Sequence, residues 1–318
     1  MATIYDVAAL AGVSPATVSR VFNGITVSAE RSERVRAAAA RLSFTPNRTA
    51  RTLRKQSSEV IALIIPDIEN PFFTALARGV EDVAQASGYS VVLCNTDEDT
   101  EKEARYLGVV VSENMAGIIL AAASDHVDLT DLTRRGRPVV AVDRSLPDVD
   151  TVTVDNVAGG RDATRALVAQ GFRRIACITG PDGGTTAEAR AEGWRKGVVN
   201  GSPDDPDRYL RHADFRVEGG YAAMVNLLNL PNPPDAVFVA NNLMAVGALR
   251  ALIERGLTPP LIGIASFGDL PFATLSPRGV TVIPLPARRL GEAAAHRLIE
   301  RLRGDDQPRR TIMLENQV

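Results

Sequence analysis

The sequence predicts a small all-α headpiece joined to a larger α/β body with parallel sheets. In residues 1–58, apolar residues recur at helical spacing, and nine Arg or Lys residues stand against three Asp or Glu, a net charge of +6. Over the rest of the chain, apolar segments of strand length alternate with helical stretches, as in parallel βαβ units. These 260 residues are many for a single sheet, so we expect the body to have two lobes.

Two short helices separated by a glycine open the headpiece. Thr3 is a candidate N-cap, and Asp6 completes a capping box. Gly12 ends this helix, and Ser14 and Pro15 suit the N-cap and first position of the next. The expected buried stripe of the second helix consists of Val18, Val21 and Phe22.

A third helix behind these two predicts a helix-turn-helix unit, whose second helix enters the major groove of DNA. Arg20 can pair with guanine, and Ala16 lies on the same face because it is four residues away. Pro15 and Ala16 can make apolar contacts with base edges. Thr17 and Ser19 suit phosphate contacts or capping. A three-helix bundle with a surface arginine is the alternative, and the basic charge disfavours it.

Residues 47–55 form a basic segment that predicts a hinge helix. Asn47 can cap it, but the segment is too short to be a stable helix alone, and its arginines repel one another. We expect it to fold when DNA phosphates neutralise it. Leu53, its large apolar residue, is a candidate wedge for a minor-groove step. A plain basic linker is the alternative interpretation.

Residues 3–55 resemble the headpiece of the LacI/GalR family of bacterial transcriptional regulators. The resemblance lies in "TIYDVAALAGVSPATVSRVFNG", "VSAERSERVRAAAARLSFTPN" and "ARTLR". It implies a homodimer on pseudo-palindromic operator DNA, with the paired hinge helices pushing Leu53 into the minor groove beside Asn47 and Ala50. The residues expected to contact DNA are Thr3, Pro15, Ala16, Thr17, Ser19, Arg20, Asn47, Arg48, Ala50 and Leu53.

The body contains strand-length segments that are apolar throughout, which predicts sheets covered on both faces. These segments are "VIALIIP", "SVVLCN", "AGIILAA", "PVVAVD", "TVTVD", "RIACITG", "DAVFVAN" and "LIGIASF". Helices are expected between them, including 71–87, 100–113, 156–170, 241–255 and 287–303. The default ligand site is a cleft at the carboxyl ends of the strands.

Polar and aromatic residues follow these strands, a combination that suits a polyhydroxyl ligand because carboxylates, guanidinium groups and amides bind hydroxyls. Each residue alone could instead be a capped or salt-bridged loop residue. The body also resembles the family's two-lobed effector domain, which is similar to periplasmic sugar-binding proteins. The expected effector-binding residues are Phe72, Phe73, Asp143, Thr186, Arg190, Phe215, Asn241 and Asp269.

Two positions depart from the family pattern. Gly268 and Asn242 stand where the family usually has Asp. The departures predict a different effector, a weaker one, or a contact shifted to Asp269.

The expected domain boundaries follow from these assignments. Residues 1–57 form the headpiece with the hinge helix, and residues 58–318 form the effector-binding and dimerisation domain. We assign about 59–157 and 286–304 to the N-terminal lobe. We assign about 158–285 and 305–318 to the C-terminal lobe.

The remaining features argue against other classes of protein. The glycine-rich "GPDGGTT" lacks the ending of a P-loop, and the three histidines have no metal or triad spacing, so we expect no enzyme, cofactor or metal. We find no export signal and no run of 18 apolar residues, so we expect a cytoplasmic protein with no membrane contact. The prediction is a DNA-binding regulator, a repressor in particular, controlled by a small molecule such as a sugar. The alternative is a stand-alone sugar-binding protein for transport or chemosensing.

Overall fold

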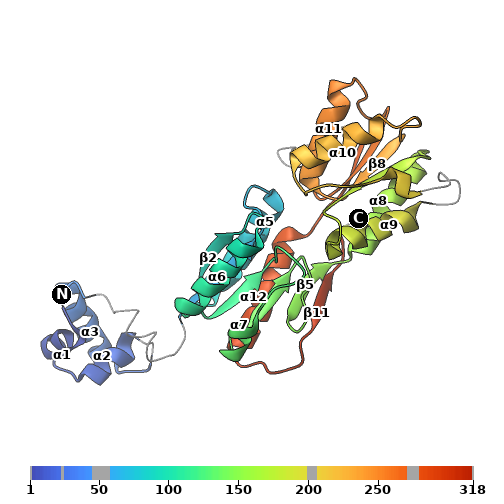
Figure 1. Ribbon diagram of the computed structural model, residues 1–318. Coiled ribbons are helices and arrows are strands. Elements are labelled where there is room, and N and C mark those ends of the chain that lie inside the picture. The colour runs from blue at the N-terminus through green and yellow to red at the C-terminus, as the bar shows by residue number, and fades with distance from the viewer. Residues whose placement is uncertain (1, 23–24, 45–57, 199–205, 271–278, 317–318) are drawn as a thin grey trace. The chain divides into compact units, whose positions relative to one another are not determined.

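The computed structural model describes residues 2–22, 25–44, 58–198, 206–270 and 279–316 (Figure 1). The chain divides into two compact units, residues 1–57 and residues 58–318. The predicted hinge helix, with Asn47, Arg48, Ala50 and Leu53, lies outside the described residues.

The described residues of the first unit form three helices, α1 (Ile4–Ala11), α2 (Pro15–Phe22) and α3 (Ala29–Arg41). The predicted capping box is present: the N–H of Asp6 donates to Thr3 Oγ1, and the N–H of Thr3 donates to the Asp6 carboxylate at 2.7 Å. Gly12 ends α1 in the left-handed region, at φ 62°. The side chains that close the small core are Val7, Val18 and Val35, all fully buried.

Arg34 holds the carboxyl end of α1, a role that the sequence did not reveal. Its guanidinium donates hydrogen bonds to the carbonyl oxygens of Ala11 and Gly12. These carbonyls have no partner within the helix, and a cation there also complements the helix dipole. One of the surface arginines of α3 therefore stabilises the turn between α1 and α2.

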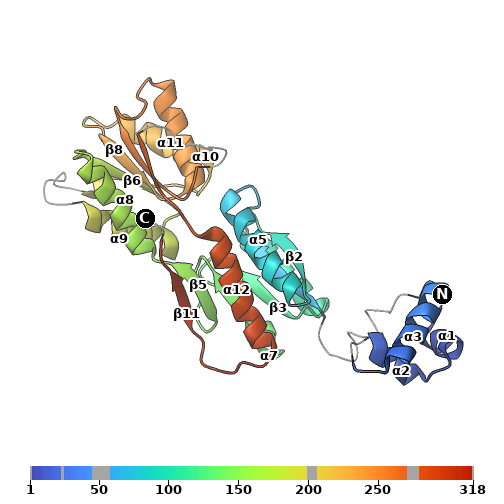
Figure 2. The same cartoon turned by 180° about the vertical axis from the view of Figure 1, so that it is seen from behind.

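In the second unit, the described residues form two parallel sheets flanked by helices, each the sheet of one lobe (Figure 2). The first sheet has the strand order β11-β5-β4-β3-β1-β2, and the second has the order β10-β9-β8-β6-β7. The strands are β1 (Val60–Ile65), β2 (Ser90–Asn95), β3 (Gly117–Leu120), β4 (Val139–Val142), β5 (Asp150–Val154), β6 (Ile175–Thr179), β7 (Leu210–His212), β8 (Ala236–Val239), β9 (Gly263–Phe267), β10 (Val280–Ile283) and β11 (Thr311–Leu314). The helices are α5 (Pro71–Ala86), α6 (Thr100–Ser112), α7 (Thr130–Arg134), α8 (Asn156–Ala169), α9 (Thr185–Gly197), the 3-10 helix η1 (Pro206–Tyr209), α10 (Val217–Leu228), α11 (Asn242–Glu254) and α12 (Ala287–Leu302).

The end of the chain belongs to the first sheet, which corrects one expectation. We assigned 305–318 to the C-terminal lobe, but β11 pairs in parallel with β5 of the first sheet. The preceding helix α12 packs against α5 of the same lobe, and both views show the two helices alongside each other (Figures 1 and 2). The chain therefore reaches the edge of this sheet without crossing back.

Strands β7, β10 and β11 were not among the predicted segments. They have three or four residues each, and β11 alternates between exposed and half-buried positions. Edge strands of this kind lack the continuous apolar pattern of a central strand. Both cysteines, Cys94 and Cys177, are buried free thiols. Within the described ranges, no helix combines the length and apolar character needed to cross a membrane.

Candidate functional site

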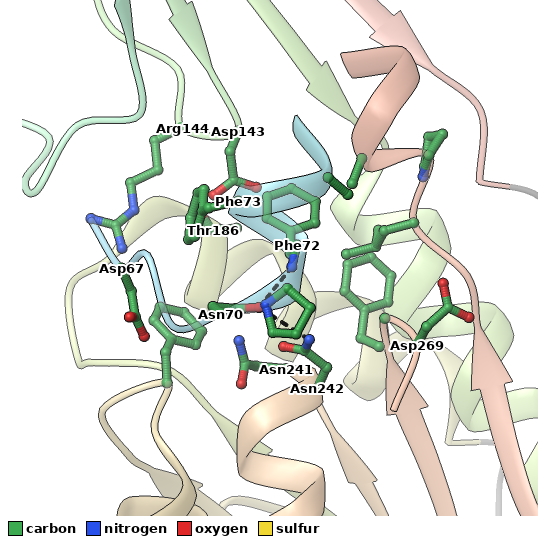
Figure 3. A pocket seen from close by; sticks show the side chains of 18 of the residues that line it. Asp67, Asn70, Phe72, Phe73, Asp143, Arg144, Thr186, Asn241, Asn242 and Asp269 are labelled. Atoms are coloured by element: carbon green, nitrogen blue, oxygen red, sulfur yellow. Dashed lines mark hydrogen bonds between the residues drawn. The ribbon is translucent and has the colours of Figure 1, made fainter. Parts of the chain in front are cut away.

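A cavity of about 440 Å³ lies at the carboxyl ends of the strands of both sheets (Figure 3). The structure brings together there all eight residues that the sequence predicted for effector binding: Phe72, Phe73, Asp143, Thr186, Arg190, Phe215, Asn241 and Asp269. They come from segments spread over some 200 positions of the chain and meet because parallel strands end at one edge of each sheet.

The start of α5 forms one wall of the cavity. Asn70 caps this helix, and its Oδ1 accepts a hydrogen bond from the N–H of Phe72 at 3.0 Å. Pro71 occupies the first position, where its missing N–H has no cost. The Phe72 ring borders the cavity, whereas Phe73 is largely buried in the core and packs edge-to-face against Phe72 with ring centroids 5.0 Å apart. Phe72 is therefore the more available ring.

Arg190 lies buried between the lobes, with its hydrogen bonds directed to fixed partners. Its Nε donates to Asn156 Oδ1 and its Nη1 to the carbonyl of Ala240, both at 2.8 Å. Its Nη2 lies 3.8 Å from Asp143 Oδ1. Burial lowers the pKa of Arg190 to about 10 despite the nearby Asp143 carboxylate, so the group remains charged at neutral pH.

The ring of Phe267 lies under this guanidinium, 4.6 Å from its central carbon. The centroid of the Phe215 ring lies 6.0 Å from the same carbon. Asp143 has a positive φ of 67° and directs its side chain into the cavity. A hydroxyl-bearing ligand would therefore meet a carboxylate, a planar cation and aromatic walls at this point.

Arg144 also lines the cavity, although it is not among the predicted effector-binding residues. It donates hydrogen bonds to both carboxylate oxygens of Glu98, at 2.9 and 2.7 Å, and to the carbonyl of Ala122. Burial disfavours the charge, but the Glu98 carboxylate outweighs burial and raises the pKa of Arg144. Its position directly after Asp143 at a strand end was the signal that could have identified it.

Asn242 has a structural explanation in the contact between the lobes. Its Nδ2 donates to Asn70 Oδ1 at 3.1 Å, and both side chains are buried. Because the N–H of Phe72 already requires Asn70 Oδ1 as an acceptor, the partner across the cleft must be a donor. A carboxylate at position 242 could not donate, so the amide suits this arrangement. Asn241 caps α11 through its Oδ1 and lines the cavity beside it.

Gly268 has a backbone that a side chain would strain. Its φ is +98°, and its N–H and carbonyl are both bonded, to Ile283 and Ser266 respectively. An aspartate could not adopt this conformation without cost. Asp269 is exposed and lies at the cavity edge (Figure 3), so the second lobe offers this carboxylate one position later.

The predicted DNA-reading residues lie on the outer face of the headpiece. Ala16 and Arg20 are exposed on α2, whereas Pro15, Thr17 and Ser19 are half-buried. Among the described residues, the Arg20 side chain makes no hydrogen bond or ion pair. Thr17 takes part in the hydrogen bonds that begin α2: its hydroxyl lies 2.9 Å from Ser14 Oγ, and its N–H donates to that oxygen. Thr3 is exposed and caps α1.

Within the described residues, one group could hold a metal ion by its spacing. Asp182, Glu188 and His212 place one ligand atom each within 4.8 Å of the others. All three are exposed, and exposed acidic groups are common without an ion.

Comparison with known proteins agrees with the two-part architecture. Residues 3–47 match the model of bacterial regulatory proteins of the lacI family, and residues 58–315 match that of periplasmic binding proteins and the sugar-binding domain of the LacI family. The ribose operon repressor of Escherichia coli K12 is 37% identical over 308 residues, covering 95% of this chain and 93% of that protein.

Two solved structures support the same assignment. The lac repressor dimer bound to operator and the anti-inducer ONPF has a TM-score of 0.83 at 27% identity, covering 99% of this chain and 97% of that one. A LacI family regulator from Enterococcus faecium with bound ribose has a TM-score of 0.72 at 28% identity, covering 81% of this chain and 96% of that one. The chain belongs to the LacI family of bacterial regulatory proteins.

Proposed function

We propose that this protein is a homodimeric transcriptional repressor in the bacterial cytoplasm whose operator affinity is controlled by a sugar. D-ribose is the first candidate, because one relative is a ribose operon repressor and another regulator was solved with ribose bound. The observation that carries the proposal is the cavity. Eight residues that suit a polyhydroxyl ligand converge there, in a chain that also carries a basic helix-turn-helix headpiece.

In the proposed complex, each headpiece reads one half of a pseudo-palindromic site. Pro15, Ala16 and Arg20 would contact base edges from α2. Thr3, Thr17, Ser19 and Arg48 would contact phosphates and set the register. In the hinge, Asn47 and Ala50 would line the minor groove and Leu53 would be its wedge.

In the proposed effector site, Asp143, Arg190 and Asn241 would bind ligand hydroxyls. Phe72 and Phe215 would lie against its C–H faces, with Phe73 supporting the first ring from the core. Thr186 and Asp269 would complete the site from the second lobe. Because these residues come from both lobes, ligand binding favours one lobe arrangement over others, by a coupling of about 1–3 kcal/mol.

The test selects a binding duplex from a random pool and follows its anisotropy with the full-length protein. We expect tight binding to a two-fold symmetric site, a change of about tenfold or more with D-ribose, and a steep loss of affinity with salt. Salt-independent binding would contradict groove recognition. If operator binding responds only to other sugars, the assignment as a repressor stands and D-ribose is replaced as the proposed effector.

Deletion of residues 1–57 separates the proposal from a stand-alone sugar-binding protein. We expect the deletion to abolish operator binding and leave sugar binding intact. Leu53→Ala should weaken specific binding far more than non-specific binding, because only the specific site is kinked by the wedge. Equal loss at both kinds of site would remove that role from Leu53.

A further inference from the structure

Asp125 connects the two lobes beside the effector cavity. It lies in the loop after β3 of the first sheet, and its carboxylate accepts two hydrogen bonds from Thr185, the first residue of α9. The Thr185 N–H lies 3.1 Å from Oδ2, and the Thr185 hydroxyl lies 3.0 Å from Oδ1. Helix α9 packs against α8 and β6 of the other lobe.

Helix α9 has no capping side chain of its own. Its N-cap residue is Gly184, whereas α5, α8 and α11 are each capped by their own Asn70, Asp155 and Asn241. The first N–H groups of a helix need acceptors, and a negative charge there is favoured by the helix dipole. The Asp125 carboxylate therefore acts for α9 as an N-cap supplied by the opposite lobe.

The loop that presents Asp125 is held in place. The N–H of Ala123 donates to the buried Glu103 carboxylate at 2.7 Å. Ser124 Oγ donates to the carbonyl of His126 at 3.0 Å and accepts from the His126 N–H at 3.3 Å. Asp125 is thus fixed relative to the first lobe before it meets Thr185.

The helix that Asp125 caps carries two cavity residues, Thr186 and Arg190. We propose that Asp125 is a positioning residue for effector binding: it caps α9 across the cleft and favours the lobe arrangement in which Thr186 and Arg190 face the ligand. The ligand measurement below rests on the proposed function, and the exchange measurement does not.

The experiment compares full-length variants by D-ribose titration calorimetry and by amide hydrogen exchange over residues 185–188. Asp125→Ala removes both bonds, Thr185→Ala removes the hydroxyl bond, and Thr185→Ser retains both. Asp128→Ala is the matched control, because Asp128 in the same loop accepts from Thr130 at the start of α7, within its own lobe.

We expect Asp125→Ala to weaken D-ribose binding about three- to tenfold and to speed exchange at the start of α9. Thr185→Ala should lie between it and the unmodified protein, and Thr185→Ser and Asp128→Ala should behave like the unmodified protein. Unchanged exchange in Asp125→Ala, or acceleration spread through the whole body, would overturn the proposal.

The two readouts separate this proposal from the proposed function. If D-ribose binds none of the proteins, the effector assignment fails and exchange alone decides the role of Asp125. Faster exchange confined to α9 in Asp125→Ala but not in Asp128→Ala then supports the cap across the cleft, and equal rates overturn it.

Discussion

Arg20 in the headpiece and Arg190 in the body are both proposed to bind ligands, but they lie in opposite environments. Arg20 is exposed on α2, and its guanidinium has no ion pair or hydrogen bond with the described residues. Arg190 is 5% exposed, and each of its nitrogens faces a protein oxygen. A partner such as DNA can supply the hydrogen-bond acceptors and negative charges that the Arg20 side chain lacks. Arg190 instead presents a prearranged surface, whose geometry decides which small ligand fits.

The two regions also differ in what stabilises them. The described headpiece is held by apolar contacts and helix caps, whereas the body contains buried ion pairs, of which Asp150 with Arg297 and Arg301 is the most enclosed. A substitution in the headpiece should therefore affect recognition with little change in the body, and the reverse should hold for the buried charges.

The largest expected effect is that of Asp150→Ala. Asp150 is 2% exposed and lies 2.9 Å from Arg297 Nε and 2.7 Å from Arg301 Nε. Its loss leaves the buried Arg297 charge without this partner, so we expect unfolding of the body to become easier by about 3–5 kcal/mol. Denaturant unfolding of the full-length chain measures this value, and protection of the headpiece amides should not change.

The same carboxylate predicts a dependence on pH. Burial disfavours its charge, but the guanidinium groups of Arg301 and Arg297 outweigh burial and lower the pKa of Asp150 below the ordinary value of 3.8. Its stabilisation is therefore fully present well above pH 3.8 and is lost as the pH falls through the lowered folded value. Asp150→Ala should lack this part of the acid dependence, and identical acid profiles would contradict the assignment.

Arg190→Lys tests whether the prearranged guanidinium group of Arg190 decides the affinity for the effector. Lysine keeps the charge but cannot reach Asn156, Ala240 and Asp143 with one planar group. We expect a loss of D-ribose affinity of about 100-fold, by calorimetry. Arg195→Lys, on an exposed position of the same helix, is the control and should bind normally. Normal D-ribose binding by Arg190→Lys would show that the planar guanidinium group is not needed for affinity.

Arg20→Ala tests whether the exposed Arg20 side chain contributes to base preference. We expect relaxed base preference at one position of each half-site, worth about 1–3 kcal/mol, and an unchanged melting temperature. Arg36→Ala, an exposed arginine of α3, removes the same charge and should leave base preference unchanged. Binding to a panel of operator variants measures both, and a uniform loss for Arg20→Ala would indicate a phosphate contact only.

Arg34→Ala should have the smallest effect and sharpen the contrast within the headpiece. It removes the hydrogen bonds to the Ala11 and Gly12 carbonyls, which solvent can partly replace. We expect a local destabilisation of about 1 kcal/mol, seen as faster amide exchange in α1. Base preference should be retained, which distinguishes Arg34 from Arg20.

Much of this architecture could be read from local sequence. The capping box of Thr3 and Asp6, the shared face of Ala16 and Arg20, and the central strands each depend on residues close together in the chain. The eight cavity residues could also be named, because the ends of parallel strands and the helices that follow them gather at one edge, and because the resemblance to the family's effector domain marked most of them. Periodicity and caps are local physical effects, so one sequence is enough to predict them.

The remaining features depend on contacts between distant segments. That β11 joins the first sheet, that Arg34 caps α1, that Asn242 must donate to Asn70, and that Asp125 caps α9 follow from pairs of groups 22 to 172 positions apart. Exposed edge strands and surface charges leave no periodic pattern, and a charge finds its partner only after packing has placed the elements. The sequence by itself determined the elements and the edge at which they meet a ligand; the tertiary structure decided which polar groups pair there, because hydrogen bonds depend on distances that only folding sets.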